Sequence, residues 1–596
     1  MFHIAMKNTA LQTFIISIFF AILLSSLFWS SRDVDSRIFY LRDYSIICAL
    51  GLSIFLFIIH IYNKSYIEVQ VSDLLILFVT VLFVSKIQTF NLENETGMKA
   101  IGFYLFFLAV RNSHFRSKEQ NTLSILFILF FFILSLTSLY YGIRYFVQFD
   151  TFLPLNYNLD NSGVLGNYLA LGFPIVFNGI SLFKNNKQTY LYYFAIATCL
   201  LILLTLFLTF ARAAWLAVLI SSAIIIIKTP QYKSYFKGYF SLFSKYSKFI
   251  VFFFPILLCC FKYNSMIGRV FINKISLLTI ADNVWTGYGI NNFSSAYHLH
   301  QATYFNQNKE IGTKEWFVAD SLRMAYNEYL QIFIEMGILG FMIFFCIIAL
   351  FIRNFIQKEK IDGAYIGFFA SLMSVLICGL FSYPFQETPI CLLFILLTAI
   401  IAPENDKTIF TLNISFSRLV ALFLIGVSIN ATIILFKIFD YKKQWLDTAR
   451  ISMNGIFEEK KYADLYVHLN TNSRFLYNYG CELSKEGQYK QSIEVLDKAM
   501  EMVIDEKNLC FQAENYYQTG DWQKAEEAYI LACNMVPSRL FPKYYLLDFY
   551  TKTHNNNKAI ETADKIVIMP EKISNEQSRL IKLTTKTILD SLQSGY

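Results

Sequence analysis

The stretch Ala325-Tyr326-Asn327-Glu328-Tyr329-Leu330-Gln331 marks the end of a long hydrophilic insertion, residues 263–326, and the start of an apolar run. The sequence has no other hydrophilic insertion of this length in its first 440 residues. The insertion also contains Gly287-Tyr288-Gly289-Ile290-Asn291-Asn292-Phe293. Irregular backbone is costly in lipid, and loops over a rigid scaffold commonly carry function. We therefore expect a folded region outside the bilayer that acts on a lipid-borne substrate.

The composition around this insertion is that of a membrane protein. Apolar residues make up 55% of the 596 residues, aromatic residues 18% and charged residues 16%. A soluble protein has about 25% charged residues. Runs such as 123–139 and 193–210 are long enough to cross a hydrocarbon core of about 30 Å as helices. The sequence thus predicts an all-α, polytopic membrane helix bundle of about 12–13 spans. The first apolar segment, 11–29, is expected to be a retained helix, because it lacks a small-residue cleavage site.

The distribution of positive charge predicts the orientation of these spans. Thirteen apolar segments are centred near residues 20, 52, 80, 104, 132, 173, 200, 219, 255, 340, 373, 395 and 428. Loops assigned to the inside, such as 228–248, are rich in lysine and arginine, whereas the short outer loops are nearly neutral. The N-terminus is therefore predicted to be cytoplasmic, with the long loop, about 262–328, and the C-terminal region outside. The formal charge of +8 reflects this orientation and gives no indication of a nucleic-acid partner.

After the membrane region, 1–440, the composition becomes that of a soluble helical domain, 441–596. Glu486-Gly487-Gln488-Tyr489 is matched thirty-three residues later by Thr519-Gly520-Asp521-Trp522, and a third copy begins at Asn555. A glycine turn before the second helix and a period near 34 resemble tetratricopeptide repeats. A plain helical bundle is the alternative. Repeats of this kind hold a protein partner or shape a groove.

The cysteines and other reactive residues indicate neither a metal nor a cofactor. Seven of the ten cysteines lie in apolar runs, where they act as small hydrophobic residues. The other three are Cys481, Cys510 and Cys533 in the repeats, where one disulfide or none is compatible with the sequence. The sequence has no phosphate-binding glycine loop, dinucleotide fingerprint or metal-ligand cluster.

Three polar features within apolar segments are candidate functional sites. Arg212 is the only charged residue between Lys187 and Lys228, and a central arginine costs about 2.5–3.5 kcal/mol on insertion scales. It is either an anion site or a residue that extends to the surface from a turn. Asn327, Gln331 and Glu335 recur every four residues, either as a functional stripe or as a hydrogen-bonded contact between helices. Asn167 is a third polar residue, near the start of a predicted span.

These segments, in this order, resemble the O-antigen ligase and polymerase family of bacterial membrane glycosyltransferases. The resemblance covers residues 100–400. The matching motifs are Gly166-Asn167, Ala211-Arg212-Ala213, Gly268-Arg269, Gly287-Tyr288-Gly289-Ile290-Asn291-Asn292-Phe293, and Tyr326-Asn327-Glu328-Tyr329-Leu330-Gln331 followed by Glu335-Met336-Gly337-Ile338-Leu339-Gly340. Each motif is weak alone, but five in the same order and topology are fairly specific.

The resemblance implies transfer of a glycan from a polyprenyl diphosphate carrier, without a metal, on the periplasmic side of the inner membrane. The predicted catalytic residues are Arg212, Arg269, Tyr326, Asn327 and Glu328. The predicted substrate-binding residues are Asn167, Gln331, Glu335, His298 and His300. A diphosphate leaving group needs cations where its charge grows, and the two arginines suit that role because a guanidinium pairs with two phosphate oxygens.

One departure from the family concerns the general base. The histidine that the family uses near the acceptor hydroxyl aligns with Tyr326, and a phenol with a pKa of about 10 is a poor base at neutral pH. Either the stabilised diphosphate leaves without strong base assistance, or Glu328 or Glu335 takes the proton, or His298 or His300 does so. Each histidine taken alone is also compatible with a surface role.

The sequence thus predicts an inner-membrane glycosyltransferase with a periplasmic helical repeat. Its partners would be a polyprenyl diphosphate-linked donor, the bilayer, and an acceptor that is a lipid A core, another glycan or a protein hydroxyl. The repeats favour a large acceptor or an assembly partner. A lipid transporter or flippase is the alternative from another class, although a large loop on one side argues against it. A non-catalytic scaffold with a decayed site is the remaining alternative.

Overall fold

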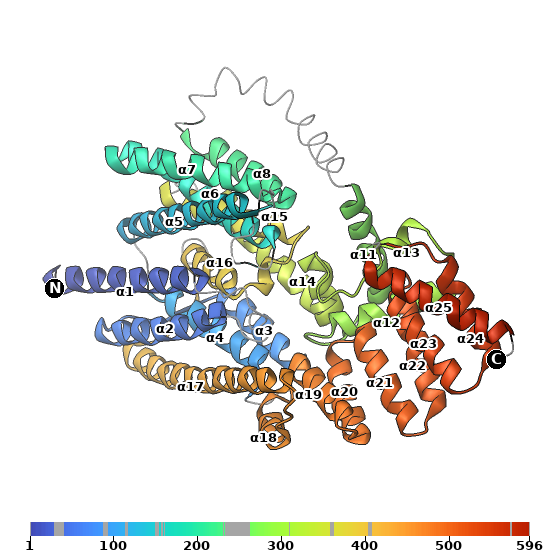
Figure 1. Ribbon diagram of the computed structural model, residues 1–596. Helices are drawn as coiled ribbons and strands as arrows, with labels where there is room; N and C mark the ends of the chain where they lie inside the picture. Colours follow the sequence, from blue (N-terminus) through green and yellow to red (C-terminus); the bar gives the residue numbers. More distant parts are fainter. Residues whose placement is uncertain are drawn as a thin grey trace.

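The computed structural model describes residues 2–28, 41–87, 93–113, 117–149, 154–155, 159, 161–230, 232, 263–308, 310–357, 363–402, 408–572 and 575–594. The membrane bundle forms one side of the molecule, and a set of shorter helices forms the other (Figure 1). Its helices are α1 (Phe2–Phe28), α2 (Ser45–Tyr62), α3 (Val71–Ser85), α4 (Glu95–Arg111), α5 (Ser117–Phe149), α6 (Ser162–Asn185), α7 (Thr189–Thr209), α8 (Arg212–Lys228), α14 (Glu328–Gln357), α15 (Gly363–Gly379), α16 (Thr388–Ile401) and α17 (Ile414–Met453).

The prediction of an all-α polytopic bundle is confirmed. Twelve of the thirteen predicted span centres fall within these helices, and the one near residue 255 lies outside the described residues. Within the described part of the chain, six helices are long and apolar enough to cross a membrane by length and composition: Ser45–Tyr62, Glu119–Phe149, Ser162–Asn185, Thr189–Thr209, Glu328–Gln357 and Ile414–Met453. Four shorter apolar helical segments accompany them: Phe14–Leu27 within α1, and the helices Val71–Ser85, Gly363–Gly379 and Thr388–Ile401.

Short irregular elements connect the bundle helices. Two 3-10 turns, η2 (Leu41–Tyr44) and η3 (Pro384–Gln386), precede α2 and α16. A two-stranded antiparallel sheet pairs β1 (Glu68–Gln70) with β2 (Thr408–Thr411). Phenylalanine-rich packing fills the bundle core, as between the stacked rings of Phe127 and Phe131. Burial of these large side chains holds the helices together where the backbone already satisfies its own hydrogen bonds.

The hydrophilic loop forms α11 (Tyr263–Asp282), α12 (Phe293–Gln307) and α13 (Lys314–Val318). The C-terminal region forms α18 (Glu459–Leu469), α19 (Ser473–Lys485), α20 (Tyr489–Met502), α21 (Glu506–Gln518), α22 (Trp522–Met535), α23 (Leu540–Lys552), α24 (Asn556–Ile568) and α25 (Glu576–Ser594). Figure 1 shows the loop helices lying against the later repeat helices. Both regions contribute residues to one hydrophobic core, although the sequence suggested separate units.

The predicted repeats correspond to three helical hairpins. Their first helices, α19, α21 and α23, begin 33 and then 34 residues apart. The turns contain Gly487, Gly520 and His554, all at positive φ, so a histidine adopts in the third hairpin the conformation that glycine supplies in the first two. The tetratricopeptide assignment itself stays a prediction.

The expected domain boundary after residue 440 falls inside α17, which is one unbroken helix of 40 residues. The packing nevertheless changes at this point. Phe439 belongs to the core of the bundle, whereas Trp445 belongs to the core of the first repeat helices. The boundary therefore separates two hydrophobic cores, but it does not coincide with the end of a helix.

Candidate active site

A pocket of about 440 Å³ lies where the start of α6, the start of α8 and the first turns of α11 meet the segment between α15 and η3. We call it the arginine pocket. Its lining combines polar and apolar side chains, with two guanidinium groups and, among the described residues, no carboxylate. The lining residues are Asn161, Ser162, Gly163, Asn167, Phe210, Ala211, Arg212, Ala213, Ala214, Leu216, Ser265, Met266, Arg269, Val270, Asn273, Tyr326, Phe381, Ser382 and Tyr383.

The start of α6 forms one wall of this pocket. The Asn161 side chain caps the helix by accepting a hydrogen bond from the Val164 N–H at 3.0 Å. Further along α6, the Asn167 Nδ2 donates to Ser382 Oγ at 3.0 Å, so this amide connects α6 to the segment after α15. A Cβ atom added to Gly166 would lie 2.5 Å from Ala211 Cβ. The glycine thus lets α6 approach the junction of α7 and α8.

Arg212 is the first residue of α8 and does not lie in the middle of a helix. α7 ends at Thr209, and the next residue, Phe210, adopts the left-handed conformation with φ 53°. The break observed here is the turn that the sequence allowed as one alternative, but the side chain also lines the pocket. The Arg212 Nη2 lies 3.4 Å from Ser265 Oγ on α11. A helix N-terminus adds partial positive charge to that of the guanidinium.

Arg269 reaches the pocket from α11. Its Nη1 donates a hydrogen bond to the Phe381 carbonyl oxygen, and its Cζ lies 5.3 Å from the ring centroid of Tyr326, a cation–π arrangement. Burial lowers the pKa of Arg269 below its ordinary value, and the positive charge of Arg212 lowers it further. The two predicted arginines therefore share one cavity and feel each other's charge.

Tyr326 lies directly between the loop and α14 and lines the pocket. Its backbone is in the left-handed region, with φ 52°, a conformation that costs a non-glycine residue free energy. The ring packs edge-to-face on Tyr383, with centroids 5.3 Å apart. Tyr326 thus forms a wall of the pocket and packs against the Arg269 guanidinium.

Asn327 and Glu328 support the pocket without lining it. The Asn327 side chain caps α14 by accepting hydrogen bonds from the N–H groups of Tyr329 and Leu330, at 3.1 and 3.2 Å. The Glu328 carboxylate is buried and accepts a hydrogen bond from the Phe385 N–H at 2.7 Å. It therefore anchors η3, which follows the pocket residues Phe381–Tyr383.

The stripe of Gln331 and Glu335 is a hydrogen-bonded contact between elements. The Gln331 Nε2 donates to Glu335 Oε1 at 3.2 Å, and the backbone of Asn291 and Phe293 also hydrogen-bonds the Glu335 carboxylate. Both side chains are buried and neither lines the arginine pocket. Their position matches the second of the two alternatives that the sequence left open, a hydrogen-bonded contact between helices.

The glycine motifs of the loop meet the glycine of α14 in what we call the glycine clasp, residues 284–289 against 334–338. α14 breaks at Gly337, with φ 69° and ψ −172°. The Tyr288 and Gly289 N–H groups donate to the carbonyl oxygens of Ile334 and Glu335, at 2.8 and 3.0 Å. The loop thus satisfies backbone groups that the break leaves unpaired.

The two loop histidines are placed outside the arginine pocket. His298 is buried, with its Nδ1 2.8 Å from the Ile504 carbonyl oxygen and its Nε2 accepting from the Leu322 N–H at 2.7 Å. Burial lowers its pKa to about 4, so it is neutral at pH 7. His300 pairs with Asp282, at 2.7 Å. Neither is in a position to receive a proton from a group in the pocket.

Sequence reasoning missed one wall of the pocket, Phe381-Ser382-Tyr383, and the cap residue Asn161. The Asn161 side chain donates to the Tyr383 hydroxyl across 222 residues of chain. A polar Ser-Tyr-Pro interruption between two apolar runs, 363–379 and 388–401, was the available signal. Nothing in that local pattern indicates which other segment it meets.

Comparison with known proteins gives a match to part of the chain. The family model described as O-Antigen ligase matches residues 197–345, a segment that contains Arg212, Arg269 and Tyr326. No curated protein matches the chain. Through this segment the chain is similar to the O-antigen ligase family.

Proposed function

We propose that the arginine pocket transfers a glycan from a polyprenyl diphosphate carrier to an acceptor hydroxyl at the periplasmic face of the inner membrane. The observation that carries the proposal is the meeting of Arg212 and Arg269 in one cavity at the ends of apolar helices. Two guanidinium groups offer donors in the fork geometry that phosphate oxygens accept, and they stay charged at any relevant pH.

The chemistry requires stabilisation of a leaving group. The acceptor oxygen attacks the anomeric carbon of the donor, the bond from that carbon to the diphosphate oxygen breaks, and the electron pair remains on the diphosphate. The hydroxyl proton leaves with the diphosphate. The arginines lower the barrier because their charge is already in place where negative charge grows. This route gives Tyr326 no role as a base; its ring instead holds Arg269 in place.

The donor's lipid tail would enter from the bilayer. Phe210 and Val270 line the pocket, and 39% and 61% of their surfaces are exposed. Apolar exposure beside two cations matches a molecule with a hydrocarbon tail and an anionic head. The Asn167 amide and Ser382 hydroxyl offer polar contacts on the α6 side of the cavity, where sugar hydroxyls could bind.

The test is complementation of a strain that lacks the protein. Arg212→Ala and Arg269→Ala should abolish glycan attachment to the acceptor, while Arg212→Lys and Arg269→Lys retain part of it because the charge remains without the fork. Arg353→Ala is the matched control, because Arg353 is exposed near the far end of α14. Mass spectrometry of the molecule that loses its glycan identifies the acceptor as a lipid A core, a glycan or a protein.

The outcome is decisive if the variants reach the membrane in normal amount. Transfer at the wild-type level in both alanine variants would remove the proposal. Equal loss in the Arg353→Ala control would show that the assay reports protein level and not chemistry, and membrane immunoblots of the same cells separate the two cases.

A further inference from the structure

The helix that carries Arg269 has a second face that is buried in a different direction. Phe271, Ile272 and Ile275 of α11 belong to a hydrophobic core that also includes residues of α12 and of the repeat helices α21 to α25. Arg269 lies only two residues before Phe271. The position of the guanidinium in the pocket therefore depends on how this core is packed.

Two side chains of α12 contact backbone carbonyl groups of the repeat region. His298 lies with its Nδ1 2.8 Å from the Ile504 carbonyl oxygen, in the turn between α20 and α21. Gln301 donates through its Nε2 to the Met535 carbonyl oxygen, at the end of α22, at 2.5 Å. Both side chains are buried. These contacts fix α12 against the turn between α20 and α21 and against the end of α22, and a hydrogen bond to a buried carbonyl is costly to lose.

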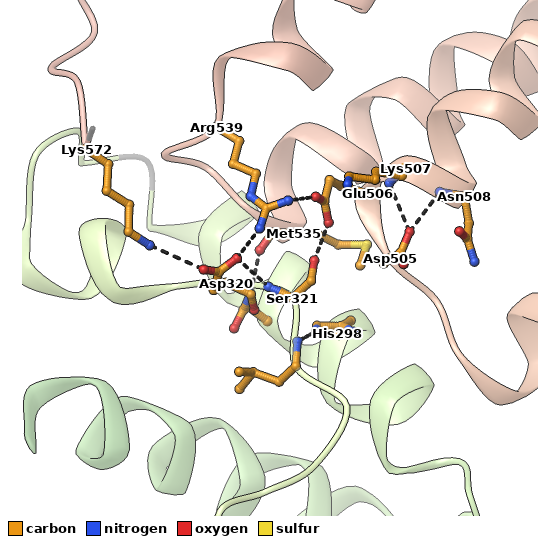
Figure 2. A network of polar contacts seen from close by, with 12 residues as sticks. His298, Asp320, Ser321, Asp505, Glu506, Lys507, Asn508, Met535, Arg539 and Lys572 are labelled. Atoms are coloured by element: carbon orange, nitrogen blue, oxygen red, sulfur yellow. Dashed lines mark hydrogen bonds and ion pairs between the residues drawn. The ribbon is translucent and has the colours of Figure 1, made fainter. Parts of the chain in front are cut away.

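A polar network at the same interface, which we call the latch, joins the segment after α13 to the repeats (Figure 2). Arg539 binds Asp320 at 2.5 Å and also binds Glu506. The Ser321 hydroxyl donates to the Glu506 carboxylate, and Lys572 lies 3.5 Å from Asp320. Figure 2 shows the Arg539 guanidinium lying between the two carboxylates.

The latch includes one buried carboxylate, that of Glu506. Glu506 is buried, with 3% of its surface exposed, so loss of Arg539 would leave a buried charge without its main cation. Asp320 and Ser321 lie in the segment that leads from α13 to Tyr326 and α14. The latch therefore acts on both ends of the outer loop, α11 through the shared core and Tyr326 through the connecting segment.

We infer that the repeat region is a positioning part of the active site, which holds Arg269 and Tyr326 in the pocket through α12 and the latch. This inference rests on the proposed function, because it assigns the repeats a task in diphosphate binding. Arg539 is accordingly a positioning residue. Among the described residues, Arg539 does not line the pocket, and neither do Asp320 and Glu506, which its guanidinium binds.

The experiment measures binding of farnesyl diphosphate, a short lipid diphosphate, to the purified full-length protein in nanodiscs by calorimetry. Arg269→Ala tests the proposed function, and about a tenfold or greater loss of affinity is expected. Arg539→Ala should weaken binding about tenfold, and Arg539→Lys should restore part of it. The double variant Arg269→Ala/Arg539→Ala should bind no more weakly than Arg269→Ala alone, because positioning has no effect once the positioned group is absent.

Two further measurements keep the inference testable. Hydrogen–deuterium exchange of residues 263–282 should rise in Arg539→Ala and not in Arg579→Ala, a matched control at an exposed arginine of α25. If Arg539→Ala does not fold, Asp320→Asn removes the same ion pair and leaves Glu506 paired.

The outcomes separate the two proposals. Wild-type binding by Arg539→Ala or Asp320→Asn, with binding lost in Arg269→Ala, would overturn the positioning role and leave the proposed function intact. Wild-type binding by Arg269→Ala would overturn the proposed function. An additive loss in the double variant would show that Arg539 stabilises the whole protein and does not act through Arg269.

Discussion

The arginine pocket and the glycine clasp both contain motifs that carry the family resemblance. The pocket motifs contribute side chains to a cavity, whereas the clasp motifs contribute backbone hydrogen bonds. In the pocket, Arg212 and Arg269 present side chains to a cavity. In the clasp, Gly287 and Gly337 present no side chain, and the backbones of the loop and α14 hydrogen-bond to each other. A short motif in a membrane protein can thus indicate either residues that line a ligand pocket or a place where two backbone segments pack together.

The difference follows from what each residue type can do near lipid. A guanidinium must find an anion or water, so it is placed at an opening. A helix break must find partners for the backbone groups that it frees, so it is placed against another backbone. The comparison predicts that pocket variants lose activity and keep stability, whereas clasp variants lose stability first.

The largest effect is expected for Arg269→Ala. Loss of one group that stabilises leaving-group charge costs about 10²- to 10³-fold in rate, about 3–4 kcal/mol. The thermal midpoint should stay within a few degrees of that of the wild type, because the change removes one hydrogen bond to a backbone carbonyl. Rate measurement and a thermal shift assay on the same sample check both statements, and a large stability loss with an unchanged rate would reverse the assignment.

The next largest effect is expected for Gly337→Ala. Its φ of 69° is unfavourable for alanine, and the added Cβ would overlap the Trp285 carbonyl oxygen. The strain and the overlap together should lower the free energy of unfolding by about 3 kcal/mol. Gly426→Ala is the control, because no atom lies within 4 Å of its added Cβ. Equal yields and thermal midpoints for the two variants would contradict the clasp.

A smaller effect, on the pH dependence of stability, tests whether the buried His298 stabilises the fold. Its pKa in the folded state is about 4, below the ordinary 6.5, so between these pH values the unfolded state binds more protons. Stability from this residue is therefore complete above pH 6.5 and falls as the pH drops towards 4, by about 2 kcal/mol at pH 5. His298→Gln should flatten the dependence of the thermal midpoint on pH. An unchanged slope would show that other groups carry it.

The smallest effect is expected for Tyr326→Phe. The ring keeps its contacts with Arg269 and Tyr383, and only the hydroxyl is lost. If Tyr326 serves as a wall and not as a base, the rate should change by less than about threefold, since a general base contributes 10²- to 10⁴-fold. A rate loss of a hundredfold or more would place the phenol in the chemistry, and Tyr326→Ala provides the comparison for loss of the ring.

The sequence predicted the bundle well because hydropathy reports directly on the solvent around a helix. It also identified Arg212, Arg269, Tyr326 and Asn167, which the structure brings together in one pocket. It did not separate them from Glu335 or His298, because a buried polar residue looks the same whether it faces a cavity or a neighbouring backbone.

The contacts that sequence reasoning could not supply are those between distant segments. Asn161 and Tyr383, 222 residues apart, meet only because α6 and α15 pack side by side. The break at Gly337 was equally hidden, since glycine is common in membrane helices and its conformation depends on the loop that pairs with it.

The unbroken course of α17 has a mechanical consequence. A helix of 40 residues is about 60 Å long and turns by about 100° with each residue. One alanine inserted after Asp440 would therefore swing everything beyond it through more than a quarter of a circle about the helix axis. Two added turns would restore the angle but displace the far end outward. The length and rotation of α17, which are set by its packing in the membrane bundle, therefore determine whether the repeat helices can reach the hydrophilic loop.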